Sequence, residues 1–176
     1  MYLDGKQVSF RNPKDAQQAG IAAIYQHVTA YPHLTVTENI FMGHEKVRRG
    51  VIQWKEMHRD AQALLDELNA DFRSTTLMGA LSVAQQQMVE IAKALSMHAR
   101  IIIMDEPTAS LTKKESEELY RITEKLRQEG ASIIFISHRF EDMYRLADRV
   151  TVFRDAEYIG TYQVDEITNG ELITAW

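Results

Sequence analysis

The sequence predicts an α/β fold in which a mostly parallel sheet is interrupted by an inserted α-helical subdomain. Two apolar runs at residues 100–104 and 132–137 flank a segment with helical periodicity at 113–129. Strand, helix and strand in this order give a parallel sheet with a crossover helix. Residues 28–97 carry helical rather than strand periodicity. We expect three parts in the chain. Residues 1–27 and 98–162 form an α/β core, residues 28–97 form a helical subdomain, and residues 163–176 form a C-terminal extension.

The first 27 residues predict a hairpin, a short helix and a buried strand. A tight turn is expected at Asp4-Gly5, because glycine tolerates positive φ. Pro13 suits the first turn of a helix that Gly20 ends. Residues 21–25 then form a buried strand that places Gln26 at its C-terminal end. Binding sites of open α/β sheets lie at this end of the strands.

The first helix of the helical subdomain is expected to begin at a capping box formed by Thr35 and Glu38 and to stop near Gly43. A longer helix follows, because apolar residues hold one helical face. They are Trp54, Met57, Ala61, Leu64, Leu65 and Leu68.

Past the subdomain, the chain is expected to return to the sheet. Thr112 with Glu115 caps the crossover helix, and Gly130 ends it. Residues 149–153 and 158–162 then pair around Asp155-Ala156, where alanine takes a place that favours glycine.

Composition and charge limit the possible functions. A chain of 176 residues with 45% apolar content can bury one core, with or without a small lobe. The absence of cysteine excludes disulfides and thiolate metal sites. A net charge of −5 gives no basic field for nucleic acid, so we expect no nucleic-acid partner. The longest aliphatic runs are too short to span a bilayer, so we expect a soluble chain that reaches a membrane only through a partner.

Two adjacent acids follow the first strand of the strand, helix, strand unit. Asp105 at this place can face a magnesium ion, usually through water, and Glu106 can act as the base beside an attacking water. Alternatively, the strand is simply buried and its acids lead into the next segment. From these residues alone, both interpretations stay open.

Ser82 is expected to cap a helix whose inner face is Ala84, Met88, Ile91, Ala92 and Leu95. Its hydroxyl and the free amides behind it offer an anion site. The alternative is a plain N-cap on a core helix, since most such caps bind nothing. The three glutamines at 85–87 favour the anion site, because three amides in one turn are hard to explain by packing.

His138 comes directly after the last predicted parallel strand, where a ring nitrogen can bridge a γ-phosphate and the base. A lone histidine at a strand end is usually structural. Here His138 and Asp105 both follow parallel strands, and ligands collect at that edge of the sheet. The other five histidines share no metal-ligand spacing, and we expect them to be surface or core residues.

Taken together, these motifs resemble the ATP-binding subunit of ABC transporters over nearly the whole chain. The family's Q-loop glutamine corresponds to Gln26, and its signature corresponds to Leu81–Gln85. Its Walker B acids correspond to Asp105 and Glu106, its D-loop to Ala109–Thr112 and its switch histidine to His138. The resemblance implies a P-loop NTPase-like fold of the ABC ATPase type, with ATP and Mg²⁺ as ligands.

The resemblance also implies a role for each site residue. The catalytic residues would be Glu106, His138 and Gln26, with Asp105 and Gln26 at the metal. The nucleotide contacts made across a dimer would be Ser82, Val83, Ala84, Gln85 and Ser110.

More narrowly, the wording LSVAQQQMVEIAKAL, DEPTASLT and GIAAIYQH resembles the N-terminal ATPase half of bacterial importers for ribose, galactose, xylose and rhamnose. The resemblance implies three partners: a second ABC ATPase domain in a head-to-tail dimer, a membrane permease subunit and, indirectly, a sugar-binding protein. It implies a peripheral place at the cytoplasmic face of the inner membrane.

The chain departs from the family pattern in three ways. Val83 and Ala84 replace the two signature glycines, and Thr112 replaces the D-loop aspartate. No G-x-x-x-x-G-K-[ST] phosphate loop, the Walker A segment, occurs in the sequence. We therefore expect an N-terminally truncated domain with exposed sheet edges, and hence marginal stability or self-association.

Three functions compete on these grounds. The leading one is the ATP-hydrolysing component of a sugar importer. Relatives in chromosome maintenance and DNA repair share the motifs, but they place a coiled coil or zinc modules between Q-loop and signature, which this acidic chain without cysteine lacks. The third is a catalytically incompetent, truncated ABC domain that acts as an interaction or regulatory module.

Overall fold

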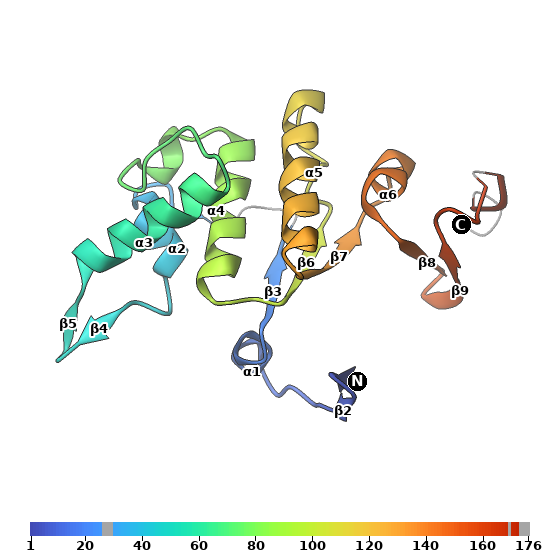
Figure 1. The fold of residues 1–176 in the computed structure, drawn as a ribbon, viewed down its shortest axis with the longest axis horizontal. Coiled ribbons are helices and arrows are strands. Elements are labelled where there is room, and N and C mark those ends of the chain that lie inside the picture. Colours follow the sequence, from blue (N-terminus) through green and yellow to red (C-terminus); the bar gives the residue numbers. More distant parts are fainter. Residues whose placement is uncertain (26–29, 169, 173–176) are drawn as a thin grey trace. The chain divides into compact units, whose positions relative to one another are not determined.

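The computed structural model of the chain describes residues 1–25, 30–168 and 170–172 (Figure 1). The chain divides into two compact units, a first unit of Met1–Ile136 and a second unit of Ser137–Trp176. The first holds the parallel sheet and the helices between its strands. Each unit is described by itself below.

The parallel sheet of the first unit has the strand order β3-β6-β7, with β3 at Ile21–Ile24, β6 at Ile101–Asp105 and β7 at Ser132–Ile136. Both neighbouring pairs are parallel, and β6 is the central strand. The crossover helix α5 (Lys113–Gln128) joins β6 to β7. The parallel α/β sheet that the sequence predicts is therefore confirmed.

The two faces of this sheet differ in cover. Ile102 and Met104 are fully buried, and Thr123 of α5 donates to the Met104 sulfur at 3.9 Å. The opposite face is open at β7, where Ile134 and Ile136 are 50% and 47% exposed. Strand alternation separates these two sets of side chains. We call the second set the open face of the sheet.

Before the sheet come a hairpin and a helix, both predicted. Strands β1 (Tyr2–Leu3) and β2 (Lys6–Gln7) pair antiparallel around Asp4-Gly5, whose φ angles are 49° and 74°. Helix α1 runs over Pro13–Gln18. Its first turn is closed by the Asn12 side chain, which accepts from the Asp15 N–H (3.0 Å).

Three helices and a 3₁₀ turn pack together between β3 and β6. They are α2 (Val36–Phe41), α3 (Trp54–Glu67), α4 (Val83–Ser96) and η1 (Met78–Ala80). A single core joins them to the sheet, with Ile40, Leu65 and Ile91 among its fully buried side chains. The side chains that pack against the sheet in this core therefore come from segments far apart in the sequence.

The buried face of α4 differs from the predicted one. Ile91 and Ala92 are fully buried as expected, while Ala84, Met88 and Leu95 are only partly buried. The helix also buries Gln87, Val89 and Ala94. One apolar stripe cannot describe α4, because the helix contacts α2, α3, α5 and β3 and so has neighbours on several sides.

The segment between α2 and α3 contains a hairpin that the sequence analysis did not anticipate. Strands β4 (Val47–Arg48) and β5 (Val51–Ile52) pair antiparallel across Arg49-Gly50, with φ angles of 53° and 77° in the turn. All four strand residues are exposed. The hairpin extends beyond the start of α3 (Figure 1).

The second unit contains helix α6 (Phe140–Leu146) and the hairpin of β8 (Arg149–Arg154) with β9 (Glu157–Gln163). Asp155 and Ala156 have φ angles of 52° and 64°, which confirms the predicted turn. Helix α6 was not predicted. None of the helices in residues 1–25, 30–168 and 170–172 is long and apolar enough to cross a membrane.

Candidate functional site

Two adjacent acids end the central strand of the sheet. Asp105 is the last residue of β6 and lies opposite Ile136 in the register. The Glu106 N–H donates to the Ile136 carbonyl (2.9 Å), so the ladder continues one residue past the strand. Alternation places the Asp105 side chain on the open face of the sheet. Both acids therefore stand at the carboxyl edge, where open α/β sheets bind ligands.

The backbone of Glu106 is strained. Its φ angle is 46°, in the left-handed region that residues with a Cβ seldom adopt. Such strain is commonest at functional sites, where surrounding hydrogen bonds hold it in place. Here the Glu106 N–H is fixed by Ile136, and its carbonyl accepts from the Ala109 N–H (3.1 Å). The turn after β6 is therefore held on both sides of this residue.

Ser110 lies in the short connection from these acids to α5. The Leu111 N–H donates to the Thr108 carbonyl (3.2 Å), which closes a turn with Ser110 exposed on it. Thr112 then caps α5 in a full capping box with Glu115. The Ser110 hydroxyl is thus presented from a loop fixed at both ends.

Ser82 is the N-cap of α4, as predicted. Its hydroxyl oxygen accepts from the Gln85 N–H (3.3 Å), and the Gln85 side chain accepts from the Ser82 N–H (3.0 Å). The other end of the Gln85 amide donates to Asp71 (2.8 Å). The Ser82 hydroxyl hydrogen can still donate to a ligand.

Val83 and Ala84 occupy the first two positions of α4, where backbone N–H groups have no partner inside a helix. Neither residue has a positive φ angle. The glycines of the family signature are therefore not needed for backbone conformation here, and the Val83 side chain is 46% exposed. The two N–H groups and the Ser82 hydroxyl lie together at this helix end.

A cleft of about 490 Å³ lies between the beginnings of α4 and α5. Ser82, Ala84 and Gln85 line it on one side, and Leu111 and Thr112 line it on the other. The signature and the D-loop are separate motifs in the sequence, and residues of both line this one cleft. Asp105, Glu106, Val83 and Ser110 are not among its lining residues.

Charge in this cleft is mainly negative. Asp71, Glu115 and Glu118 line it together with one cation, Lys114. The pKa of the Glu115 carboxyl is lowered by its hydrogen bond from Thr112, which keeps it ionised. The positive end of α4 therefore faces carboxylates of its own chain, and a phosphate there would need further cations.

One residue of this cleft, Asp71, was missed by sequence reasoning, and a second, Gln87, was noted only as part of a run of glutamines. Asp71 binds the signature glutamine from a loop eleven positions before Ser82, and no local pattern marks it. Gln87 is 4% exposed, and its Oε1 atom has no hydrogen-bond partner in the described part of the chain. The Gln85-Gln86-Gln87 triple did signal an unusual use of amides.

His138 lies in the second unit, two residues after β7 ends, and its side chain is exposed. The turn around it is built by Ser137, whose hydroxyl donates to Asp142 (2.6 Å) and accepts from the Arg139 N–H (3.0 Å). Asp142 is fully buried. The predicted Q-loop residue Gln26 lies outside the described residues.

No group of three or more His, Asp or Glu side chains able to hold a metal occurs in the described residues. This is compatible with magnesium, which is commonly held by one or two carboxylates together with substrate phosphates. The Asp105 side chain presents a carboxylate on the open face.

Comparison with known proteins identifies the family. The family model described as ABC transporter matches residues 1–109. "Ribose import ATP-binding protein RbsA 2" of Escherichia coli O157:H7 is 46% identical over 97% of this chain and 34% of its own length. A "Putative ribose/galactose/methyl galactoside import ATP-binding protein 1" of Burkholderia ambifaria is 48% identical over 97% of this chain and 33% of its own length. The chain thus spans about a third of these curated relatives.

Solved structures agree on the fold. The ATP-binding cassette MJ1267 of an ABC transporter superposes with a TM-score of 0.83 at 21% identity, covering 99% of this chain and 75% of that one. The structure of cbiO1 from Clostridium perfringens gives a TM-score of 0.79 at 20% identity, covering 98% of this chain and 69% of that one. Together with the family match, the parallel sheet and the ordered motifs, these similarities show that the chain belongs to the ABC transporter family.

Proposed function

We propose that this chain is part of the ATP-binding and ATP-hydrolysing component of an importer that moves a carbohydrate across the cytoplasmic membrane. The single observation that supports this most is the 46–48% identity, over 97% of the chain, to ribose and galactose import ATP-binding proteins. The sugar class and the direction of transport come from those names.

The proposed chemistry is attack of water on the γ-phosphorus of ATP. Glu106 accepts a proton from the water as the new P–O bond forms. The bond from the γ-phosphorus to the bridging oxygen breaks, which releases ADP and phosphate. The fixed backbone of Glu106 supports this role, because the base is oriented before the substrate arrives.

Two further residues are proposed to act with Glu106. His138 holds the γ-phosphate by a ring N–H. Gln26 positions the water and contributes to the metal site, together with Asp105. When bound, Mg²⁺ would neutralise negative charge on the phosphates of ATP. The Asp105 carboxylate on the open face fits this ion, directly or through water.

The signature residues are proposed to serve a different ATP molecule. The nucleotide that they contact would be held by a second ABC ATPase domain in a head-to-tail dimer. The contacting residues would be Ser82, Val83, Ala84 and Gln85, together with Ser110, which directly precedes the cleft-lining residues Leu111 and Thr112. This is supported by the cleft, whose lining includes Ser82 but neither Asp105 nor Glu106. A partner's lysine would also add to Lys114, which is the one cation among the lining residues of this acidic cleft.

The remaining partners follow from the same similarity. We propose a membrane permease subunit as the docking partner, a sugar-binding protein as the indirect one, and a peripheral place at the cytoplasmic face of the inner membrane. The second candidate function is an interaction or regulatory module without hydrolysis. It is favoured by one observation, that the 176 residues contain no phosphate-loop motif.

The decisive experiment measures Mg-ATP binding and hydrolysis by the chain, alone and mixed with an ABC ATPase domain that carries a phosphate loop and a mutated signature serine. The variants are Glu106→Gln and Ser82→Ala. Glu67→Gln is the matched control, because Glu67 is exposed and ends α3.

If this chain provides a signature face, hydrolysis appears in the mixture and Ser82→Ala abolishes it. If it provides a base, hydrolysis is lost in Glu106→Gln and kept in Glu67→Gln. Binding with no hydrolysis in any mixture would support the regulatory module instead.

A further inference from the structure

The β4–β5 hairpin exposes an unusual amount of apolar surface. Val47 and Val51 are 58% and 63% exposed, and Trp54, which begins α3 directly after the hairpin, is 45% exposed. The register sets Val47 opposite Ile52 and Arg48 opposite Val51. Apolar side chains therefore stand on both faces of a ribbon that is open to solvent on both sides.

The same segment is cationic. Residues 46–55, KVRRGVIQWK, carry Lys46, Arg48, Arg49 and Lys55 and no acid, and with the flanking Glu45 and Glu56 the charge is +4 − 2 = +2 in a chain whose net charge is −5. Chain-wide composition hides this local charge. Exposed aliphatic residues, an exposed tryptophan and clustered cations thus coincide in ten residues.

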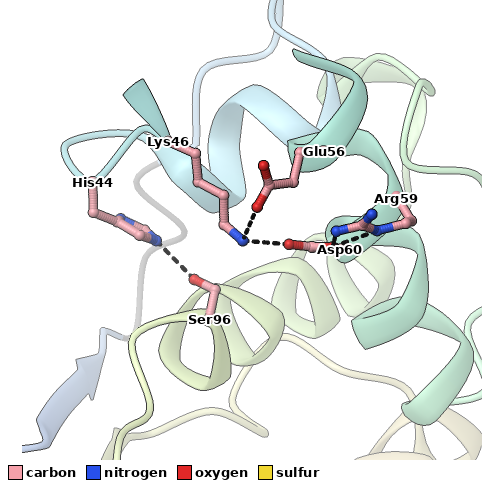
Figure 2. A network of polar contacts seen from close by, with 6 residues as sticks. All are labelled: His44, Lys46, Glu56, Arg59, Asp60 and Ser96. Atoms are coloured by element: carbon pink, nitrogen blue, oxygen red, sulfur yellow. Dashed lines mark hydrogen bonds and ion pairs between the residues drawn. The ribbon is translucent and has the colours of Figure 1, made fainter. Parts of the chain in front are cut away.

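A polar network holds the base of the hairpin against α3 (Figure 2). The Lys46 ammonium binds Asp60 and also Glu56 (3.2 Å), both on α3. The Gln53 N–H donates to the Lys46 carbonyl (2.8 Å). A hairpin of two short strands is not stable alone, so these contacts fix its position.

This network also determines which cationic side chains of residues 46–55 are left without an ion pair. Lys46 is neutralised by its two carboxylate partners. Arg48, Arg49 and Lys55 form no ion pair with any carboxylate in the described residues. Three cations are therefore presented at and beside the apolar tip.

We propose that the β4–β5 hairpin binds the anionic surface of a lipid bilayer. Tryptophan and aliphatic side chains partition into the interfacial region of a membrane, and adjacent arginines and lysines are attracted to acidic headgroups. A specific protein interface commonly buries about 800 Å² per partner, far more than four strand residues provide. A fluid headgroup layer requires no shaped partner surface.

The second unit offers an internal comparison. The β8–β9 hairpin also exposes aromatic residues, with Phe153 and Tyr158 at 61% and 62%. Its residues 149–163 carry two arginines and two acids, Asp155 and Glu157, a charge of +2 − 2 = 0. Only the β4–β5 hairpin combines apolar exposure with cationic charge, among the hairpins of the described residues.

The test uses Trp54 as its own reporter. The chain has two tryptophans, so Trp176→Phe leaves Trp54 as the fluorophore. Vesicles of phosphatidylcholine alone are compared with vesicles of equal parts phosphatidylcholine and phosphatidylglycerol. We expect a blue shift of emission and co-sedimentation with the anionic vesicles only, both lost as ionic strength rises from about 0.01 to about 0.5 M. Neither readout requires ATP, so failure here leaves the proposed ATPase function untouched.

Two variants of the hairpin separate its charge from its apolar surface. Arg48→Gln with Arg49→Asn removes two cations, and asparagine tolerates the positive φ at position 49. It should weaken partitioning about 30-fold. Val47→Thr with Val51→Thr keeps strand propensity and charge, and should weaken it roughly tenfold. Phe153→Ser in the β8–β9 hairpin is the control and should change nothing.

Three results would overturn the proposal. One is equal affinity of the charge variant and the parent chain for anionic vesicles. Another is loss of binding in Phe153→Ser to the same extent. The third is binding of Trp54 to soluble polyglutamate without binding to vesicles, which would assign the hairpin to an acidic protein. Urea unfolding of each variant shows whether its fold is intact.

Discussion

At the scale of single residues, Glu106 combines a reactive side chain with a backbone that favours glycine. A positive φ costs a residue with a Cβ about 1–2 kcal/mol. The chain nevertheless has glutamate here, with φ at 46°. If Glu106 is the base, the destabilising backbone conformation serves to position its carboxylate.

Glu106→Gly and Glu106→Ala measure that cost, because both remove the side chain and differ only in the Cβ. We expect the glycine variant to have a free energy of unfolding about 1 kcal/mol higher than the alanine variant. Urea denaturation followed by circular dichroism gives the difference. Equal stability of the two variants would mean that the turn relaxes when the glutamate side chain is absent.

His44 offers a residue-scale test of pH dependence. Its Nε2 lies 2.8 Å from the Ser96 hydroxyl, which itself donates to the Lys93 carbonyl, so the His44 Nε2–H donates to Ser96 (Figure 2). Burial lowers the pKa of the imidazole, and nearby Lys93 adds to the lowering, while the Met42 backbone and Glu45 oppose it. The folded chain thus favours neutral His44.

The sign of the effect follows from that direction. Below its ordinary pKa of 6.5 the unfolded chain binds a proton at His44 more readily than the folded chain does. Stability from this group is therefore complete above pH 6.5 and is lost as pH falls through the folded pKa. We expect unfolding free energies measured between about pH 7.5 and about pH 5 to fall less in His44→Gln, whose amide can replace the ring N–H. Identical slopes would contradict this.

Most candidate residues of the site could be predicted from the sequence, because each follows a short local motif. Asp105 and Glu106 end an aliphatic strand, and Ser82 precedes a helix. Their roles in ATP hydrolysis stay predictions. Asp71 could not be found, since its hydrogen bond to Gln85 depends on tertiary folding of a loop. Nor does any local pattern report the positive φ of Glu106.

At the scale of elements, α2, α4 and α5 each begin with a complete capping box, at Thr35, Ser82 and Thr112. Each cap satisfies an N–H that the helix leaves unpaired. These starts were predicted because all the groups involved lie within four consecutive residues. The β4–β5 hairpin and α6 were missed, because their sequences lack such local signals and tertiary contacts hold them.

The cap of α5 yields an element-scale prediction. Thr112→Ala should lower the free energy of unfolding by about 1 kcal/mol. Thr112→Asp, which restores the family's D-loop residue, should be nearly neutral, because aspartate is an equally good N-cap. Thermal and urea unfolding measure both variants. A stable alanine variant would show that Glu115 and packing alone fix this helix end.

At the scale of the whole molecule, the two units differ in the size of their cores. The second unit buries Val152, Ile167 and Leu172 as its apolar core within the described residues. The core of the first unit draws on the sheet and all its helices from α2 to α5. A small core supports less local stability, so the second unit should open more readily.

Hydrogen exchange tests this difference directly. We expect backbone amides of β8 and β9 to be less protected from exchange than those of β6 and β7. Val152→Ala should speed exchange in β8 and β9 and leave β6 unchanged. Equal protection across both units would indicate one cooperative structure. The predicted domain boundaries at residues 27 and 97 stay a prediction.

The alternation along β6 has a genetic consequence. Met104 is packed into the core and Asp105 is on the open face. The direction of the Asp105 carboxylate therefore depends on its being the fifth residue of the strand, because successive side chains point to opposite faces. Deletion of one codon among residues 101–103 would turn the acid into the core and Met104 toward the open face. Loss of two codons would shorten the strand yet keep the acid on its side. In-frame length variants of this gene segment should therefore survive selection preferentially in pairs of codons.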